Sequence, residues 1–241
     1  MQEFASLLRK ETHTLHRQVE SGTFMTALLK GQLDKSSYVL FLRNLEPIYA
    51  QLEQCLNQHA NAPGISPILM RPLFRLPSLH RDLEFLHGAC WRTDVEQLAA
   101  CSTYVDRLCA IRVFAPDRLT AHAYVRYLGD LSGGQMLQKI VSQSLKLTDH
   151  NNGVNFYNFG QPDEVMELVQ SFRTGLNLIG ESGETRRNDL VDEALIAFSL
   201  HVSLFNDLAL CCGLSNTLLQ ALSGDPTEGS NPSVQSSGAL G

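Results

Sequence analysis

The sequence lacks several patterns by which common protein classes are identified. Its six cysteines form no CxxC pair, and no Cys/His group has zinc-finger spacing. It has no secretory signal pattern and no apolar run of the roughly 20 residues that a bilayer requires. HExxH, a Ser-His-Asp order and a phosphate-binding glycine loop are also absent. We therefore expect reduced thiols in a cytoplasm and no membrane segment.

Charge is also scarce, and it is not basic. Charged residues make up 18% of the 241 residues, and the formal net charge is -6, which argues against a nucleic-acid partner. Hydrophobic residues make up 44%, which is ordinary for a globular protein and sufficient for a large core.

Apolar residues recur at three- and four-residue spacing nearly throughout, and no useful period-two strand pattern appears. This predicts an all-α domain over 1–215. We expect Pro47 to interrupt and kink its helix and Asp94 to be the N-cap of a helix ending near Phe114. Residues 216–241 are predicted to be a disordered tail, because Gly, Ser and Pro leave it almost nothing to bury. The expected helices span 4–19, 38–56, 78–87, 94–114, 116–147, 163–179 and 183–212.

The stretch AHAYVRYLGDLSGGQML, residues 121–137, has helix-forming flanks and a glycine-rich middle. Each of its three glycines costs about 1 kcal/mol relative to alanine inside a helix. Gly129 and Gly133 share one face, where the missing Cβ would let a flat ligand approach the backbone. Two alternatives remain open: close packing against another helix, or a break at Gly133-Gly134. We expect a helix broken open by glycine.

Asp130 lies beside this glycine face, four residues after Arg126. An Arg-Asp pair at this spacing is often a solvated surface pair. If the carboxylate faces inward instead, it could hold ordered water.

His16 is a candidate metal ligand near the apolar side of the first helix. Glu20, one turn later, could accept a ring N–H and leave the other nitrogen free for a metal. The alternative is a partly buried histidine that Glu20 satisfies. Spacing alone does not make any other histidine a better candidate ligand; the others are His13, His59, His80, His87, His122, His150 and His201.

Together these segments resemble the haem oxygenase family. The run AYxRYLGDLSGGQ around Tyr124 to Gln135 is a long and specific match, and the match at His16 continues through Glu20 and Phe24-Met25. The resemblance extends from about Phe4 to about Cys212. It implies a single compact multi-helix domain, with haem held between a proximal helix and a glycine-kinked distal helix.

The resemblance also implies roles near the iron. His16 matches the proximal iron ligand, and Glu20 matches the acidic residue that supports it. Asp130 matches the distal aspartate that organises water above the iron. Gly129 and Gly133 match the glycines that contact the haem face.

Other positions match the pocket wall and the propionate end. Arg126, Tyr49 and Tyr124 fall in the polar network or the wall, and Phe198 and Phe205 match aromatic positions of the pocket. Arg173 falls where a basic residue meets a haem propionate, and Arg9 is a candidate for the other end. Where the family often carries lysines, this chain has His13 and Val169, which leaves the rotation of haem and the regiochemistry of ring opening undetermined.

The implied activity is oxidative opening of haem to biliverdin, with release of carbon monoxide and ferrous iron. Haem is then both cofactor and substrate, and dioxygen is the co-substrate. No flavin or nicotinamide motif is visible, so a ferredoxin or a flavoprotein reductase is expected to supply electrons, and a biliverdin acceptor is a further candidate partner. A positive patch on which the electron donor docks could be formed by Arg9, Lys10, Arg17 and Lys139. Solvated helix faces would explain these basic residues equally well.

Two other functions compete with this one. A haem carrier or sensor would keep the fold without turnover, but it has no need of Asp130. A haem-free helical bundle, such as a bilin- or thiamine-related relative, is disfavoured by His16 and the intact GDLSGG run. The resemblance is to soluble bacterial or plastid-type members, so we expect a location in the cytoplasm or the plastid stroma.

Overall fold

The helical spacing of apolar residues gives an all-α architecture in the computed structural model, which describes residues 3–148 and 152–214. Those residues form nine α-helices and four short 3-10 turns, and no strand occurs among them. The 3-10 turns are η1 (Ser66–Ile68), η2 (Arg71–Leu73), η3 (Pro116–Arg118) and η4 (Asn155–Tyr157). The helices are α1 (Phe4–Ser21), α2 (Thr23–Leu29), α3 (Lys35–Gln58), α4 (Leu76–His87), α5 (Trp91–Asp94), α6 (Ala99–Phe114), α7 (Leu119–Ser144), α8 (Pro162–Gly180) and α9 (Glu184–Cys211).

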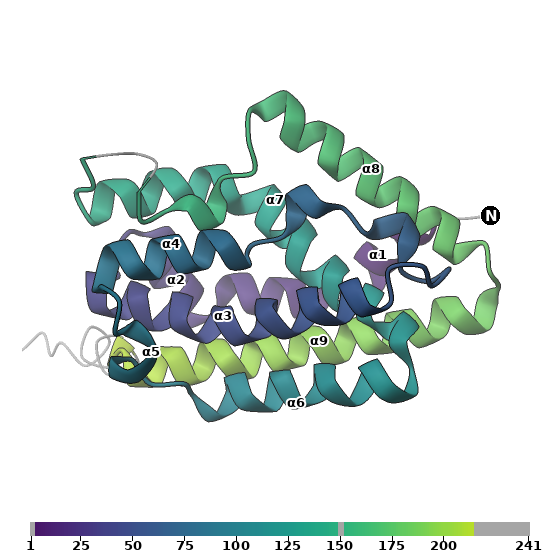
Figure 1. Ribbon diagram of the computed structural model, residues 1–241, viewed down its shortest axis with the longest axis horizontal. Coiled ribbons are helices and arrows are strands. Elements are labelled where there is room, and N and C mark those ends of the chain that lie inside the picture. The colour runs from purple at the N-terminus through teal and green to yellow at the C-terminus, as the bar shows by residue number, and fades with distance from the viewer. Residues whose placement is uncertain (1–2, 149–151, 215–241) are drawn as a thin grey trace, which may run out of the picture.

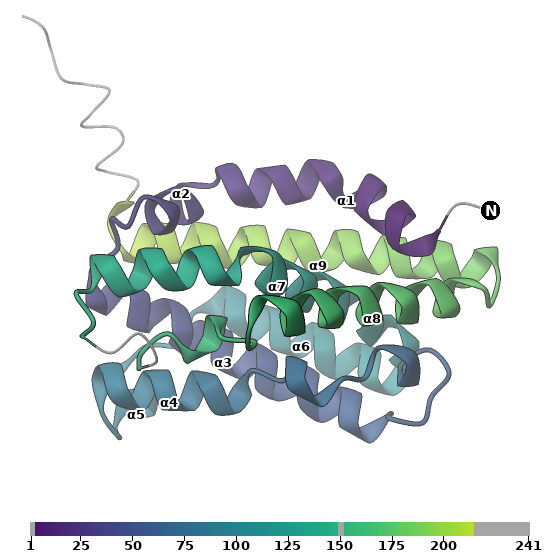
Figure 2. The ribbon, with the colours of Figure 1, turned by 90° about the horizontal axis from the view of Figure 1, so that it is seen from above.

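The last long helix, α9, is the centre of the packing. It contacts α1, α2, α6 and α7, so segments from both ends of the chain meet along it. Figure 1 shows α6 running beside α9, and Figure 2 shows α1 beside α9 on another side. α3 packs against α4, α6 and α7 and completes the interior. The site described below lies where α1 and α7 both approach α9.

Among the described residues, only α9 is long and apolar enough to cross a membrane by length and composition. Of its most apolar window, 44% is buried inside the protein. Its interior face also carries Glu193 and His201, which are both buried. Burial against four other helices is a sufficient reason for its apolar composition.

Helix starts are fixed partly by side chains that are distant in the sequence. Asp34 caps α3 by accepting the Ser37 backbone N–H at 2.8 Å, which is a local pattern. At α6 the prediction of Asp94 as N-cap is wrong. Asp94 ends the short α5 and pairs with His87, while the Ala100 N–H in the first turn of α6 donates to Asp207 on α9. Tertiary packing therefore supplies the cap.

The two expected interruptions of long helices do not occur. α3 continues through Pro47 as one helix of 24 residues. α7 runs unbroken through all three glycines, although its ribbon changes direction along its length in Figure 1. Buried residues before and after the glycines, such as Tyr127 and Val141, anchor the helix and offset its low propensity. The helix is bent rather than broken.

The domain boundary at 215 and the predicted disordered tail over 216–241 lie outside the described residues.

Candidate functional site

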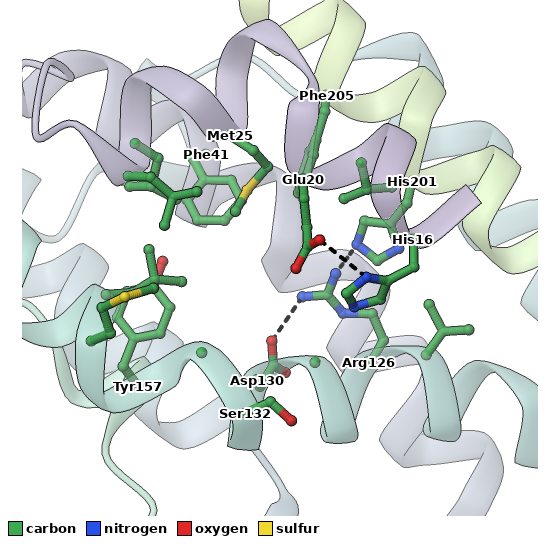
Figure 3. Close-up of a pocket in the computed structure, with 18 of the residues that line it drawn as sticks. His16, Glu20, Met25, Phe41, Arg126, Asp130, Ser132, Tyr157, His201 and Phe205 are labelled. Carbon is green, nitrogen blue, oxygen red and sulfur yellow. Dashed lines mark hydrogen bonds and ion pairs between the residues drawn. The ribbon is translucent and has the colours of Figure 1, made fainter. Parts of the chain in front are cut away.

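A cavity of about 320 Å³ lies between α1, α2, α7 and α9. Its polar side chains gather at one end and include His16, Arg126 and Asp130, while Met25 and Phe41 lie at the other end (Figure 3). A chamber with a polar end and an apolar end suits a largely apolar ligand that reacts at a defined position.

A second cavity, of about 400 Å³, continues the first toward the start of α1 and toward α8. It is lined by Arg9, Tyr124 and Arg173, and the Tyr124 hydroxyl lies 3.2 Å from the Thr12 hydroxyl in a hydrogen bond. The residues that line both cavities are His16, Val125, Gly129, Ser132 and Phe198. The two cavities therefore adjoin, and we refer to them together as the cleft, with Arg9 and Arg173 at its outer part.

The glycines of α7 divide into two groups by what surrounds them. A Cβ placed on Gly129 would meet no atom within 4 Å, and one on Gly133 would meet only the Leu137 side chain at 3.7 Å. A Cβ on Gly134 would lie 3.0 Å from the Tyr157 carbonyl oxygen. Gly134 is therefore a packing glycine, whereas Gly129 and Gly133 leave one face of α7 open to the cleft. Close packing is excluded as the reason for the first two.

Asp130 points into the protein rather than to the surface. Its side chain is 10% exposed and that of Arg126 is 7% exposed, with 3.4 Å between the guanidinium Nη2 and the carboxylate. The Tyr49 hydroxyl, from α3, donates to Asp130 and accepts the Arg126 Nε–H at 2.9 Å. The surface-pair alternative is therefore wrong, and two adjacent turns of α7 form one buried polar cluster with Tyr49 of α3.

Burial dominates the electrostatics of this cluster. It raises the pKa of the Asp130 carboxyl above its ordinary value, although the charge of Arg126 and the hydrogen bond from Tyr49 oppose the change. Burial also raises the pKa of Tyr49. Asp130 thus holds a proton more readily than an exposed aspartate does, while Tyr49 remains protonated and able to donate.

His16 faces the cleft from α1 with Glu20 beside it. The Nδ1 atom lies 3.4 Å from a Glu20 carboxylate oxygen, and the ring meets Phe198 edge-on at 5.8 Å between centroids. The His16 side chain is 51% exposed. The alternative of a partly buried, structurally satisfied histidine does not describe it, because half of its side chain is exposed and it lines both cavities.

The apolar end of the cleft is closed by the turn η4, which a buried carboxylate holds in place. Asp82, on α4, accepts the backbone N–H groups of Asn155 and Phe156 at 2.9 and 2.7 Å and the Asn155 side-chain amide at 2.8 Å. These bonds fix Phe156 and Tyr157 in the cavity wall. Gly134 lets α7 approach the same turn.

The sequence reasoning missed one member of the polar end. His201, on α9, lines the first cavity, is 4% exposed and pairs with Arg126 (Figure 3). A signal was available, because His201 lies three residues after Phe198 and four before Phe205, which share its helix face. The described residues contain no group of three or more His, Cys, Asp or Glu side chains that could hold a metal.

The structure brings almost all of the predicted site residues to this cleft. Tyr49 lines neither cavity, but its hydroxyl donates a hydrogen bond to Asp130. Neither lysine-substituting residue, His13 or Val169, lines either cavity. The predicted residues that line one or both cavities are Arg9, His16, Glu20, Tyr124, Arg126, Gly129, Asp130, Gly133, Arg173, Phe198 and Phe205.

Comparisons with known proteins agree on one family. The family described as Heme oxygenase matches residues 2–207. "Heme oxygenase 1" of the cyanobacterium Synechocystis sp. PCC 6803 is 37% identical over 204 residues, which cover 85% of this chain and 84% of the relative. "Heme oxygenase 1" of Homo sapiens is 33% identical over 86% of this chain and 72% of its own length.

Solved structures give the same answer. The crystal structure of heme oxygenase-1 from Synechocystis in complex with heme superposes with a TM-score of 0.82 at 34% identity, covering 92% of this chain and all of that one. Heme oxygenase-2 from the same cyanobacterium, in complex with heme and NO, gives 0.85 at 32% identity, covering 95% of each chain.

Proposed function

The chain belongs to the haem oxygenase family, and from that premise we propose that the cleft between α1 and α7 binds haem and directs its opening to biliverdin. The activity is that of a haem oxygenase, an oxidoreductase that degrades haem. The observation that carries the assignment to this cleft is the open glycine face of α7, which lies next to Asp130 and is exposed to the same space as His16.

The residues present fit a flat, largely apolar macrocycle with two carboxylates. Gly129 and Gly133 leave one face of α7 without Cβ atoms, so the backbone itself can contact a ring. Phe198 lines both parts of the cleft, and Phe205 adds a second aromatic ring.

Two groups of residues would hold haem. His16 would bind the iron through the nitrogen that does not face Glu20, and the Glu20 carboxylate would fix the orientation of the ring. Arg9 and Arg173 line the outer cavity and would pair with the propionates. When bound, haem supplies both the iron at which dioxygen reacts and the ring that is opened.

The protein's own part in the chemistry centres on Asp130. Its carboxyl holds a proton more readily than usual because it is buried, and Tyr49 and Arg126 fix its orientation. Through a water it can deliver a proton at Oδ1 or Oδ2 without contacting the reacting oxygen directly. The backbone of Gly129 and Gly133 limits the space on that side of the cleft.

Dioxygen and external electrons complete the reaction. We propose a ferredoxin or a flavoprotein reductase as the donor, docking near the outer cavity, whose lining residue Arg9 is exposed. A biliverdin acceptor and a location in the cytoplasm or plastid stroma stay predictions. A carrier or sensor without turnover is the competing function, and Asp130 in the buried cluster argues against it.

Reconstitution with haemin tests the proposal. On addition of a reductant and oxygen, the Soret band should decay while long-wavelength bilin absorbance appears; a Soret band that persists would favour the carrier. His16→Ala should lose the iron-histidine spectrum, whereas His13→Ala, on the same helix but outside both cavities, should keep it. An unchanged spectrum in His16→Ala would point to a different ligand.

A further inference from the structure

Two free cysteines lie at matching positions on a pair of parallel helices. α3 and α6 pack against each other and run in the same direction (Figure 1). Near the start of α6 the Asn44 side chain accepts the Leu98 backbone N–H at 2.7 Å, which pairs residues that are 54 positions apart. Cys55 and Cys109 have the same separation, because each lies eleven residues further along its own helix.

The helical repeat brings these two cysteines back to the facing sides of the helices. Eleven residues make three turns of an α-helix to within about 20°. Side chains that face each other at the level of Asn44 and Leu98 therefore do so again at the level of Cys55 and Cys109. The structure agrees with this register, since the Cys109 thiol lies close enough to the Cys55 thiol for the two to interact electrostatically.

The two thiols differ in their access to solvent and in their surroundings. Cys55 is fully buried and accepts a hydrogen bond from the Gln51 amide at 2.9 Å, whereas Cys109 is half-buried. Burial raises the pKa of the Cys55 thiol, while the hydrogen bond from Gln51 and the charge of Arg112 oppose the change. Cys109 is therefore the thiol that a dissolved oxidant reaches first, and Cys55 is held beside it.

We propose that Cys55 and Cys109 form a peroxide-sensitive dithiol, which oxidation converts into a disulfide between α3 and α6. The Cys109 sulfur attacks one oxygen of hydrogen peroxide, the O–O bond breaks, and the departing hydroxide takes up the thiol proton to give water and a sulfenic acid. The Cys55 sulfur then attacks the Cys109 sulfur, so that the S–S bond forms and the second oxygen leaves as water. Two thiols lose two electrons, and one peroxide becomes two waters.

The reverse step needs only a dithiol reductant, which suits a compartment where disulfides are transient. The site does not include the cleft, and the inference goes beyond the proposed function. The remaining cysteines supply controls. Cys101 is also buried on α6, but its charged neighbours on α3 are Arg43 and Glu46, and Cys90 is exposed.

Peptide mapping of the full chain without haem tests the bond itself. After treatment with hydrogen peroxide, free thiols are blocked and the protein is digested with trypsin. We expect mass spectrometry to show the peptide of Cys55 linked to that of Cys109, with Cys101 still reduced, and dithiothreitol to separate the pair. Cys109 recovered as a sulfenic or higher acid while Cys55 is still free would overturn the proposal, as would oxidation confined to Cys90.

Thermal unfolding gives a second readout. Oxidation should raise the Tm of the original protein by roughly 5 °C or more, because the bond closes a long loop in the unfolded chain. Cys109→Ser, at a half-buried position, should lose this rise, and so should Cys55→Ala, while Cys90→Ser should keep it. A rise that persists in Cys109→Ser, or that is absent from the original protein, would overturn the proposal. Because haem is left out, neither outcome depends on the proposed function.

Discussion

Replacing Gly129 by alanine should stabilise the protein and weaken haem binding at the same time. A Cβ at this position meets no atom within 4 Å, so no strain offsets the gain in helix propensity. That gain is about 1 kcal/mol. For a domain of this size, it corresponds to a rise in Tm of roughly 2–4 °C. The methyl group would occupy the face on which the ring is proposed to lie.

The assay combines thermal unfolding of the haem-free protein with haemin titration. We expect the higher Tm together with a loss of haem affinity of about tenfold, equivalent to about 1.4 kcal/mol. Gly134→Ala is the control, because its Cβ would lie 3.0 Å from the Tyr157 carbonyl oxygen and should lower Tm instead. A Gly129→Ala variant that binds haem as tightly as the original would refute contact between this face and haem. A lower Tm in Gly129→Ala would contradict the absence of atoms near this face of α7.

Two further predictions concern the structure around the site. Asp82→Ala leaves the N–H groups of Asn155 and Phe156 without their acceptor, which should lower the free energy of unfolding in urea by roughly 3 kcal/mol. The control Asp106→Ala, at an exposed position, should change it by almost nothing. Equal losses in the two variants would contradict the role of Asp82 in holding η4. Burial raises the pKa of Glu53 to about 7, although the carboxylate accepts hydrogen bonds from the backbone N–H groups of Arg75 and Leu76, which lower the pKa. Because the folded pKa is the higher one, the stability linked to this proton is fully present below about pH 4.5 and is lost as pH rises toward 7. Relative to Glu53→Gln, the original protein should therefore lose up to about 1.4 kcal/mol of unfolding free energy per pH unit in that window, and parallel pH profiles would contradict the raised pKa.

The parts of the site that follow from local chemistry were predictable. The glycine spacing on α7 placed Gly129 and Gly133 on one face, and the i,i+4 spacing placed Glu20 next to His16. Both are properties of a single helix, and they hold wherever that helix lies in the fold. Which of the open alternatives applied depended on what packed against the helix.

Features that join distant segments were not predictable in the same way. Asp94 is a residue type typical of an N-cap, but the backbone N–H in the first turn of α6 donates to Asp207 of α9 instead. His201 has no spacing relation to Arg126 and meets it only after α7 and α9 pack together. The predicted break at the glycines does not occur for the same reason, since tertiary packing on both flanks keeps α7 helical.

Single turnover of the haem complex tests the proposed role of Asp130 most directly. Asp130→Asn removes the proton-holding carboxyl but keeps the size of a side chain that Tyr49 and Arg126 surround. We predict a normal Soret band on haem binding, with biliverdin formation reduced at least about a hundredfold, and full activity in the exposed control Asp106→Asn. Biliverdin formed at the original rate by Asp130→Asn would contradict the account.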